Sequence, residues 1–231
     1  MNKQIFTLSF LLFFCIGLYA QPKAAGDPKE LAKASVPLRK PVWSDDGQKL
    51  TFTSLKDEGL WEISVTGKNL RQVSAEAGIQ RKAVSGNPLV QQMVDAPAKV
   101  AEQVKGLESL SGCILFNPVL SPKGDKIVFQ AGNGKGLFVC NADGSGLRSI
   151  GNGQRPTWTV DGKYVVAMIT KDDGYTVTQG ELISINVATG AQNTLFSSKN
   201  FIALSPAISP DGTKLAFEEY ASGVIYLINI Q

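Results

Sequence analysis

The stretch that decides the fold is Ser205–Glu219, which reads SPAISPDGTKLAFEE. It consists of a short apolar segment, a tight turn that ends at Gly212, and a second segment in which apolar residues alternate. A glycine in this place fits a turn position with positive φ, and a hydrophobic period of two residues indicates a half-buried strand. The stretch therefore predicts a β-hairpin.

The same pattern occurs in three other places. Each copy has a proline, two mostly apolar residues, a Ser or Thr, a turn that ends in glycine, and an alternating run. The copies are PVWSDDGQKLTF (41–52), PVLSPKGDKIVF (118–129), PTWTVDGKYVVA (156–167) and PAISPDGTKLAF (206–217). A third strand follows each hairpin, and a fourth follows the first three. Four antiparallel strands repeated about every 40 residues predict the blades of a β-propeller.

The spacing of the copies predicts five blades. The gap between Ser44 and Ser121 spans about two repeat periods, so we expect a degenerate blade near residues 79–112. In that blade Ser85 would occupy the position that Ser44 has in the first. The alternative is a helix over Ala96–Leu110, because Ala, Lys, Glu and Leu favour helices. The last blade ends on its third strand. We therefore predict that the mature N-terminal segment, through Leu31–Ser35, supplies its fourth strand and closes the ring.

The first 20 residues predict a secretory signal peptide. Lys3 precedes a largely apolar run, and small residues end it before Gln21. Cys15 raises the alternative of a lipoprotein, but the bulky residues before it do not fit a lipid-attachment motif. We expect residues 21–231 to form a single propeller domain in the periplasm or outside the cell. Once the signal is cleaved, we expect no transmembrane segment.

Composition excludes several classes of function. The 231 residues carry a formal net charge of only +3, which does not argue for nucleic-acid binding. The chain has no histidine, which removes Ser-His-Asp and Cys-His catalysis and any zinc site that needs histidine. An exported compartment permits a disulfide between Cys113 and Cys140, but their apolar neighbours favour two buried free thiols.

The repeats resemble those of the TolB-type propellers, a WD-like family marked by P-x-W-S-P-D-G-x-x-I-A-F. The match is strong at SPAISPDGTKLAF and KPVWSDDGQKLTF and covers essentially the whole mature chain. The resemblance implies a β-propeller of the bacterial envelope, used for binding or scaffolding rather than catalysis. TolB itself has six blades and an additional N-terminal domain, so its particular partners are not implied here.

One aligned position predicts a binding site. It is the residue before the proline of each repeat, and it is occupied by Lys40, Arg81, Asn117, Arg155 and Ser205. If these residues face one another at the mouth of the central channel, they concentrate positive potential that suits an acidic peptide, a carboxylate or an anionic glycan. The alternative is that each pairs with a carboxylate of a neighbouring blade. Tyr175, in a long hairpin without a counterpart in other blades, is a further binding candidate.

Other repeated side chains predict packing rather than chemistry. Trp43 and Trp158 occupy equivalent inner-strand positions, which favours contacts between blades. The third-strand position shared by Trp61, Phe138 and Tyr226 favours the same role. The segment NADGSG (141–146) begins like a calcium loop, but a tight turn with a glycine bulge explains it better because later calcium ligands do not follow.

The leading functional hypothesis is a monomeric, non-catalytic binding propeller of the cell envelope. We expect its partner to be an envelope protein or acidic peptide, or a glycan, and we expect no catalytic residues, metal site or cofactor. The alternatives are an accessory subunit of an envelope complex and a five-bladed glycoside hydrolase. The hydrolase would need two or more carboxylates on the inner strands, whereas Asp46, Asp161 and Asp211 lie in turns.

Overall fold

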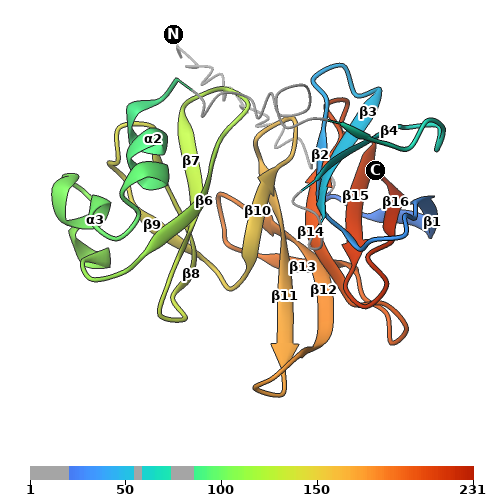
Figure 1. The fold of residues 1–231 in the computed structure, drawn as a ribbon. Helices are drawn as coiled ribbons and strands as arrows, with labels where there is room; N and C mark the ends of the chain where they lie inside the picture. The colour runs from blue at the N-terminus through green and yellow to red at the C-terminus, as the bar shows by residue number, and fades with distance from the viewer. Residues whose placement is uncertain (1–20, 55–58, 74–85) are drawn as a thin grey trace, which may run out of the picture.

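The computed structural model describes residues 21–54, 59–73 and 86–231, which form an all-β fold of four-stranded antiparallel sheets (Figure 1). The first sheet contains β2 (Leu38–Trp43), β3 (Lys49–Ser54), β4 (Leu60–Ser64) and β5 (Arg71–Val73). The second contains β6 (Leu115–Leu120), β7 (Lys126–Ala131), β8 (Gly136–Asn141) and β9 (Arg148–Gly151). The third contains β10 (Gln154–Trp158), β11 (Tyr164–Asp172), β12 (Val177–Asn186) and β13 (Gln192–Phe196). The predicted fold class is confirmed.

The fourth sheet joins the two ends of the described chain. Its strands are β14 (Ala203–Ile208), β15 (Lys214–Glu219), β16 (Ile225–Ile230) and β1 (Ala24–Ala32), with β1 antiparallel to β16. The N-terminal segment therefore supplies the fourth strand of the last blade, as the sequence predicts. The strand begins earlier than the predicted Leu31–Ser35, because Ala24 already pairs with Ile230, and it ends at Ala32, which pairs with Ile225.

The prediction of a blade near residues 79–112 is wrong for its described part. Residues 86–112 contain α2 (Pro88–Asp95), α3 (Val100–Gln103) and the 3₁₀ helix η1 (Glu108–Leu110) in place of strands. The alternative helix over Ala96–Leu110 is only partly right, because α3 and η1 are two short helices and α2 lies before them. The described ranges thus contain four sheets instead of five blades.

Local chemistry explains why α2 forms. The Asn87 side chain accepts hydrogen bonds from the amides of Leu89 (2.9 Å) and Val90 (3.1 Å), and Pro88 occupies the first helical turn. This is a strong N-cap arrangement, since proline has no amide hydrogen to leave unsatisfied there. The helix buries Leu89, Val90 and Met93 against the second sheet, where a preceding blade would otherwise pack.

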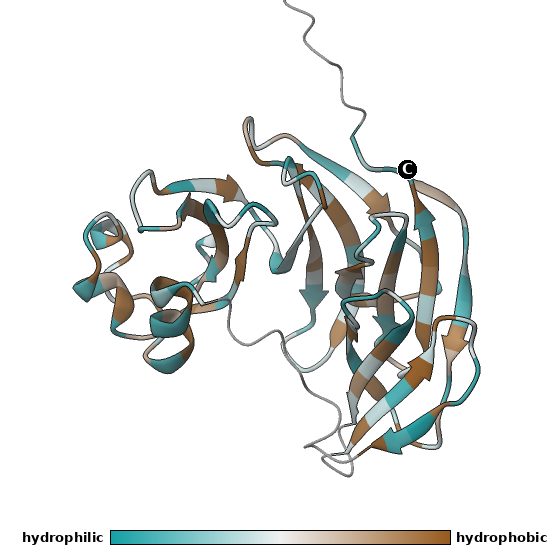
Figure 2. Ribbon diagram, turned by 90° about the horizontal axis from the view of Figure 1, so that it is seen from above, coloured by the Kyte–Doolittle hydropathy of each residue, from teal (hydrophilic) through white to brown (hydrophobic). Residues whose placement is uncertain are grey.

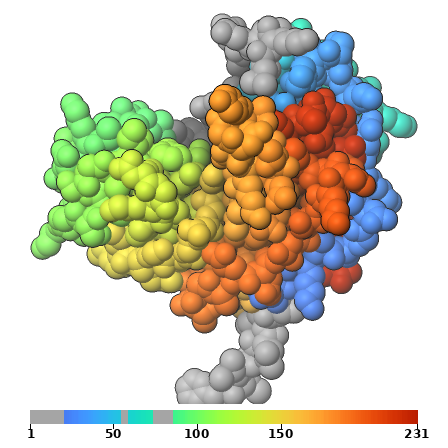
Figure 3. Space-filling view, turned by 90° about the horizontal axis from the view of Figure 1, so that it is seen from below, coloured from blue at the N-terminus to red at the C-terminus, as the bar shows by residue number. Residues whose placement is uncertain are grey.

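Four apolar clusters connect the helices and sheets in one series. The clusters join the helical segment to the second sheet, the second sheet to the third, the third to the fourth, and the fourth to the first. In Figure 3 the colours follow this order across the molecule, from green through yellow, orange and red to blue. Figure 2 shows hydrophobic and hydrophilic residues alternating along the strands, as expected for sheets that bury rows of side chains between neighbours.

The repeated tryptophans pack between sheets, as predicted. The indole nitrogen of Trp43 donates to the Ala207 carbonyl (2.9 Å), and that of Trp158 donates to the Val119 carbonyl (2.9 Å). Each tryptophan thus bonds to the inner strand of the preceding sheet in the series. Phe138 and Tyr226 stack within their own sheets, on Phe129 and Phe217 respectively, and Trp61 packs against the cluster between the fourth and first sheets.

The outer face of the first sheet is polar. The paired row there runs from Val42, which is 48% exposed, through Thr51 and Glu62 to Arg71, and Glu62 accepts from Arg71 at 3.0 Å. In the second sheet the equivalent row is Val119, Val128 and Val139, packed against the third sheet. A polar outer face is what a terminal unit of a stacked array needs for solubility.

The two cysteines, Cys113 and Cys140, are free and buried, in agreement with the sequence interpretation. Both lie in the cluster beneath the helical segment, and burial raises the pKa of the Cys140 thiol to about 12. The thiols therefore act as small apolar groups in this core. Among the described residues, no helix is both long and apolar enough to cross a membrane.

The first prediction concerns how the helical segment docks. Gly144 has a φ of +91°, and a Cβ there would lie 2.8 Å from Val104 Cγ1. Gly144→Ala should lower the free energy of unfolding by about 3 kcal/mol, because it adds overpacking to left-handed strain. Gly134→Ala is the matched control, since φ is +71° and the added Cβ would meet nothing within 4 Å. That control should cost about 1.5 kcal/mol in urea titrations; equal losses would contradict the docking contact.

The second prediction concerns the repeated turns. Asp211 accepts hydrogen bonds from the Ser209 hydroxyl (2.5 Å) and the Thr213 amide (3.0 Å), which lower the pKa of its carboxyl from 3.8 to about 2. Its contribution to stability is therefore present above about pH 4 and is lost as the pH falls toward 2. Asp211→Asn should make the free energy of unfolding depend less on pH between about pH 4 and pH 2, as measured by urea titration at each pH. An unchanged slope would show that this turn does not contribute.

Candidate functional site

The aligned position before each proline has an unusual backbone. Every described member is a non-glycine residue with a left-handed φ. The values are +54° at Lys40, +53° at Asn117, +49° at Arg155 and +53° at Ser205. Such backbone costs about 1–2 kcal/mol per residue for side chains other than glycine, and it is often found at functional sites. Arg81, the fifth predicted member, lies outside the described residues.

A β-bulge produces this conformation in each inner strand. The pairing register shifts between Arg39 and Val42 in β2, and at the equivalent places in β6, β10 and β14. The inner strand therefore has one residue more than the paired second strand at this place, which bends the inner strand and redirects a side chain. The bulge also gives the Lys40 amide hydrogen a partner in another sheet, as described next.

Glu218 is a buried carboxylate where the bulges of β2, β10 and β14 meet. It lies on β15 of the fourth sheet and is only 4% exposed. Its side chain accepts a hydrogen bond from the Lys40 amide in the first sheet, and another from the Ser205 hydroxyl at 3.3 Å. Burial raises the pKa of the Glu218 carboxyl, while these hydrogen bonds and nearby guanidinium groups act in the opposite direction.

Cations from two further positions act on Glu218. Arg39 of the first sheet and Arg155 of the third sheet both interact electrostatically with its carboxylate. Arg39 also donates to the carbonyls of Glu219 (3.2 Å) and Tyr220 (2.7 Å), and its guanidinium lies 5.6 Å from the centre of the Tyr220 ring. The half-buried Arg155 guanidinium has no hydrogen bond or ion pair to another described residue. We call Arg39, Lys40, Arg155, Ser205 and Glu218 the central cluster.

The structure thus brings together three of the six predicted site residues. Lys40, Arg155 and Ser205 come from three different sheets and surround one carboxylate. Asn117 instead donates from Nδ2 to Gln130 Oε1 (3.2 Å) within its own sheet. The predicted alternative, pairing with a carboxylate of a neighbouring blade, is partly realised, because Lys40 bonds to Glu218 through its backbone amide.

Sequence reasoning missed Glu218 and Arg39. The missed signal is the sixth residue after each turn glycine, which is Thr53, Gln130, Met168 or Glu218 in the four sheets. This residue pairs with the inner strand of its own sheet beside the bulge. In two cases it also accepts a hydrogen bond from the bulged residue of the next sheet: Glu218 accepts from the Lys40 amide, and Met168 Sδ accepts from the Ser205 amide at 3.3 Å. A charge at such an inward position of an apolar strand is a signal for a special environment.

Tyr175 stands apart from the central cluster. It lies at the tip of the β11–β12 hairpin, which protrudes at the bottom of Figure 1, and its side chain is 96% exposed. The Asp173 carboxylate orders the tip by accepting from the amides of Tyr175 (3.0 Å) and Thr176 (2.8 Å). The hairpin projects beyond the bulged end of the third sheet, since β11 continues past Met168, the partner of Gln154.

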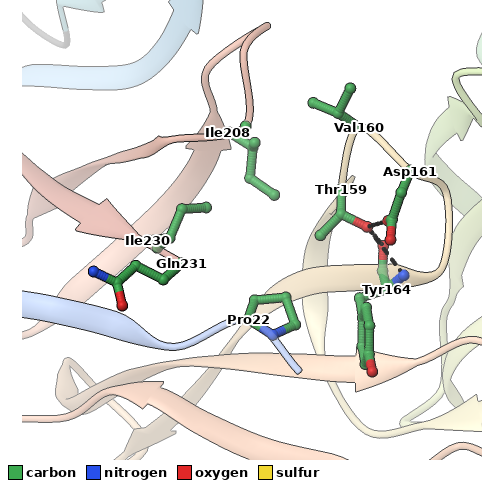
Figure 4. A pocket seen from close by; sticks show the side chains of 9 residues that line it. Pro22, Thr159, Val160, Asp161, Tyr164, Ile208, Ile230 and Gln231 are labelled. Atoms are coloured by element: carbon green, nitrogen blue, oxygen red, sulfur yellow. Dashed lines mark hydrogen bonds between the residues drawn. The ribbon is translucent and has the colours of Figure 1, made fainter. Parts of the chain in front are cut away.

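Figure 4 shows a separate pocket of about 230 Å³ between the third and fourth sheets. It is lined by repeat-turn residues such as Thr159 and Asp161, and by Pro22 and Gln231 near the two ends of the described chain. The Asp161 carboxylate already accepts from the Thr159 hydroxyl at 2.6 Å. None of the predicted site residues lines this pocket. The described residues also contain no group of three or more His, Cys, Asp or Glu arranged to hold a metal ion.

The NADGSG segment forms a turn that satisfies its own polar groups. Asp143 accepts from the Ser145 amide (2.9 Å) and hydroxyl (2.7 Å), and Asn141 donates to the same hydroxyl at 2.9 Å. Gly144 and Gly146 both have positive φ. This agrees with the predicted tight turn.

Comparisons with known proteins identify fold neighbours only. No protein-family model matches the chain, and no curated protein matches it. Among solved structures, a putative TolB from Agrobacterium tumefaciens is 17% identical over 87% of this chain and 61% of its own, with a TM-score of 0.43. An oligogalacturonate lyase from Vibrio parahaemolyticus is 13% identical over 83% and 48%, with a TM-score of 0.38. The β-propeller domain of the Trilobed protease from Pyrococcus furiosus is 18% identical over 50% and 38%, with a TM-score of 0.39.

By name these neighbours are a TolB, a lyase and a domain of a protease, so they do not select a function. The chain spans less than two thirds of the length of each of these structures.

The third prediction tests the left-handed bulge. Asparagine tolerates positive φ better than most residues and already occupies this position as Asn117. Lys40→Asn should therefore change the free energy of unfolding by less than about 1 kcal/mol. Lys40→Val should lower it by about 2 kcal/mol, because a β-branched side chain is poorly tolerated there. Equal stability of the two variants in urea titrations would show that the left-handed backbone does not restrict which side chain is tolerated at this position.

Proposed function

We propose that this chain is a non-catalytic binding propeller, exported to the periplasm or cell envelope, that recognises an anionic group on a partner protein or peptide. The observation that carries the proposal is the convergence of the Arg39 and Arg155 guanidinium groups and the Lys40 backbone amide on one buried carboxylate, Glu218. Two cations around one anion leave a net positive centre, which attracts a further negative group.

The chemistry of the Lys40 and Arg155 side chains supports this choice of ligand. The Lys40 side chain is exposed, and neither its ammonium nor the Arg155 guanidinium bonds to another residue in the described part of the chain. A guanidinium binds a carboxylate through two parallel hydrogen bonds, and an ammonium adds a point charge. An acidic side chain or a C-terminal carboxylate would satisfy both.

Export is part of the same proposal. Its support is the charged and apolar pattern of residues 1–20, which lie outside the described residues. The free cysteines are compatible with export, because burial protects them from oxidation. An anion-binding module without a disulfide can therefore work in the envelope.

Glycoside hydrolysis is supported less well than binding. That reaction needs two carboxyl groups, one on each side of the scissile bond. In the central cluster, Glu218 is the one carboxylate that the inner-strand cations face, and both of its oxygens accept hydrogen bonds from the protein. This arrangement orders a binding site better than it protonates a sugar.

The fourth prediction tests the proposed function. The double variant Lys40→Asn, Arg155→Asn should capture its partner from crosslinked envelope extract at least about tenfold less than residues 21–231 unaltered, because two charge-assisted contacts are lost. Asparagine keeps the left-handed backbone, so the fold should be retained. The matched control, Lys105→Asn with Lys199→Asn, removes the same charge from exposed positions elsewhere. Equal capture by all three proteins would place binding outside the central cluster.

A further inference from the structure

We propose that Glu218 makes the anion site proton-dependent: a carboxylate ligand binds between Arg155 and Lys40 together with one proton, which neutralises Glu218. This inference rests on the proposed function, and it adds the form of regulation. It stands on the position of Glu218, which is buried where the first, third and fourth sheets meet.

The groups around Glu218 define its two charge states. Facing it are Arg39 and the Lys40 amide from β2, Ser205 from β14 and Arg155 from β10. Its strand partners are apolar, namely Leu204 on β14 and Ile225 on β16, and the next residue on its own strand is Glu219. When it is ionised, Glu218 is the anion that these cations face. When it is protonated, the cations face no anion of the cluster.

An external carboxylate must compete with ionised Glu218. Two carboxylates that share the same cations repel each other, and in such pairs one carboxyl takes up a proton. Burial already disfavours the ionised form of Glu218 and raises its pKa, so protonating it costs less than for an exposed glutamate. The proton comes from solvent and resides on Glu218, and no other group needs to change its charge.

The hydrogen bonds of Glu218 allow either state. Lys40 donates a backbone amide to one oxygen, and the Ser205 hydroxyl donates to the other. A protonated carboxyl keeps the acceptor for Lys40 and can donate to the Ser205 oxygen, since a hydroxyl group both donates and accepts. The contact between the first and fourth sheets therefore survives protonation, and the charge of the cluster changes without loss of packing.

The pH dependence follows from this linkage. Ligand binding coupled to uptake of one proton weakens by at most tenfold for each pH unit above the pKa of Glu218. A C-terminal carboxylate has a pKa near 3.5, so the ligand itself stays ionised above pH 5. Affinity for a carboxylate should therefore rise as the pH falls from 8 to 5, and Glu218 is the group that titrates.

The test is isothermal titration calorimetry from pH 5 to pH 8 with three N-acetylated alanine-based tetrapeptides. One ends in a free carboxylate, one ends in an amide, and one is amidated but carries an internal glutamate. We expect at least about tenfold tighter binding of the carboxylate peptides at pH 5 than at pH 8, with uptake of up to one proton measured across buffers of different ionisation enthalpy. The first and third peptides distinguish a C-terminal carboxylate from an acidic side chain.

Variants assign the effect to Glu218. Glu218→Gln is permanently neutral and can keep both hydrogen bonds, so it should bind at pH 8 as tightly as the unaltered protein at pH 5, without proton uptake. The control Glu219→Gln changes the neighbouring carboxylate, which is engaged by Ser222 in its own turn, and should retain the pH dependence. Arg155→Asn should lose binding at every pH.

The outcomes separate the two proposals. Carboxylate binding that is independent of pH, or that keeps its pH dependence in Glu218→Gln, would overturn the role of Glu218 and leave the proposed function intact. Equal binding of the free and amidated peptides at every pH would overturn both. If Glu218→Gln does not fold, the number of protons that the unaltered protein takes up on binding the carboxylate peptide still tests whether binding is coupled to protonation.

Discussion

The left-handed residue before each repeat proline is the constraint on which the candidate site depends. At this bulge the inner strand gains one residue relative to its neighbour, and the following proline can donate no hydrogen bond of its own. The amide of the bulged residue is therefore free to find a partner in the preceding sheet. Lys40 finds the Glu218 carboxylate and Ser205 finds the sulfur of Met168, so the same distortion repeats while its partner varies.

Repetition explains what the sequence predicted well. The hairpins, the Ser–Asp turns and the tryptophans between sheets recur because each sheet solves the same packing problem against its predecessor. Local signals decide such features: turn glycines, alternating strands, and a Ser hydroxyl that bonds within its own turn. The aligned position before the proline was found in the same way, without knowledge that its backbone is left-handed.

Features that depend on one copy alone were harder to predict. The spacing of the repeats predicts a degenerate blade, but the match to the repeat is weak there. Asn87 caps a helix that begins at Pro88, and this local signal decides the structure of the segment. The exact place of β1 depends on pairing with β16, some 200 residues away, and strand pairing over such separations leaves little local signal. Glu218 was missed because its importance comes from residues of three sheets, which only the tertiary fold brings together.

The two ends of the series of described sheets are covered differently. Apolar residues of the helical segment pack on the second sheet, and a polar row with the Glu62–Arg71 ion pair lies on the first sheet. Each sheet that contributes to the cluster is packed against a neighbour in the series, so the bulges of the first, third and fourth sheets are held in place. A buried carboxylate at such a junction is costly unless it is compensated. At Glu218 the compensation comes from the Lys40 amide, the Ser205 hydroxyl and the guanidinium groups of Arg39 and Arg155, which three different sheets bring to one point.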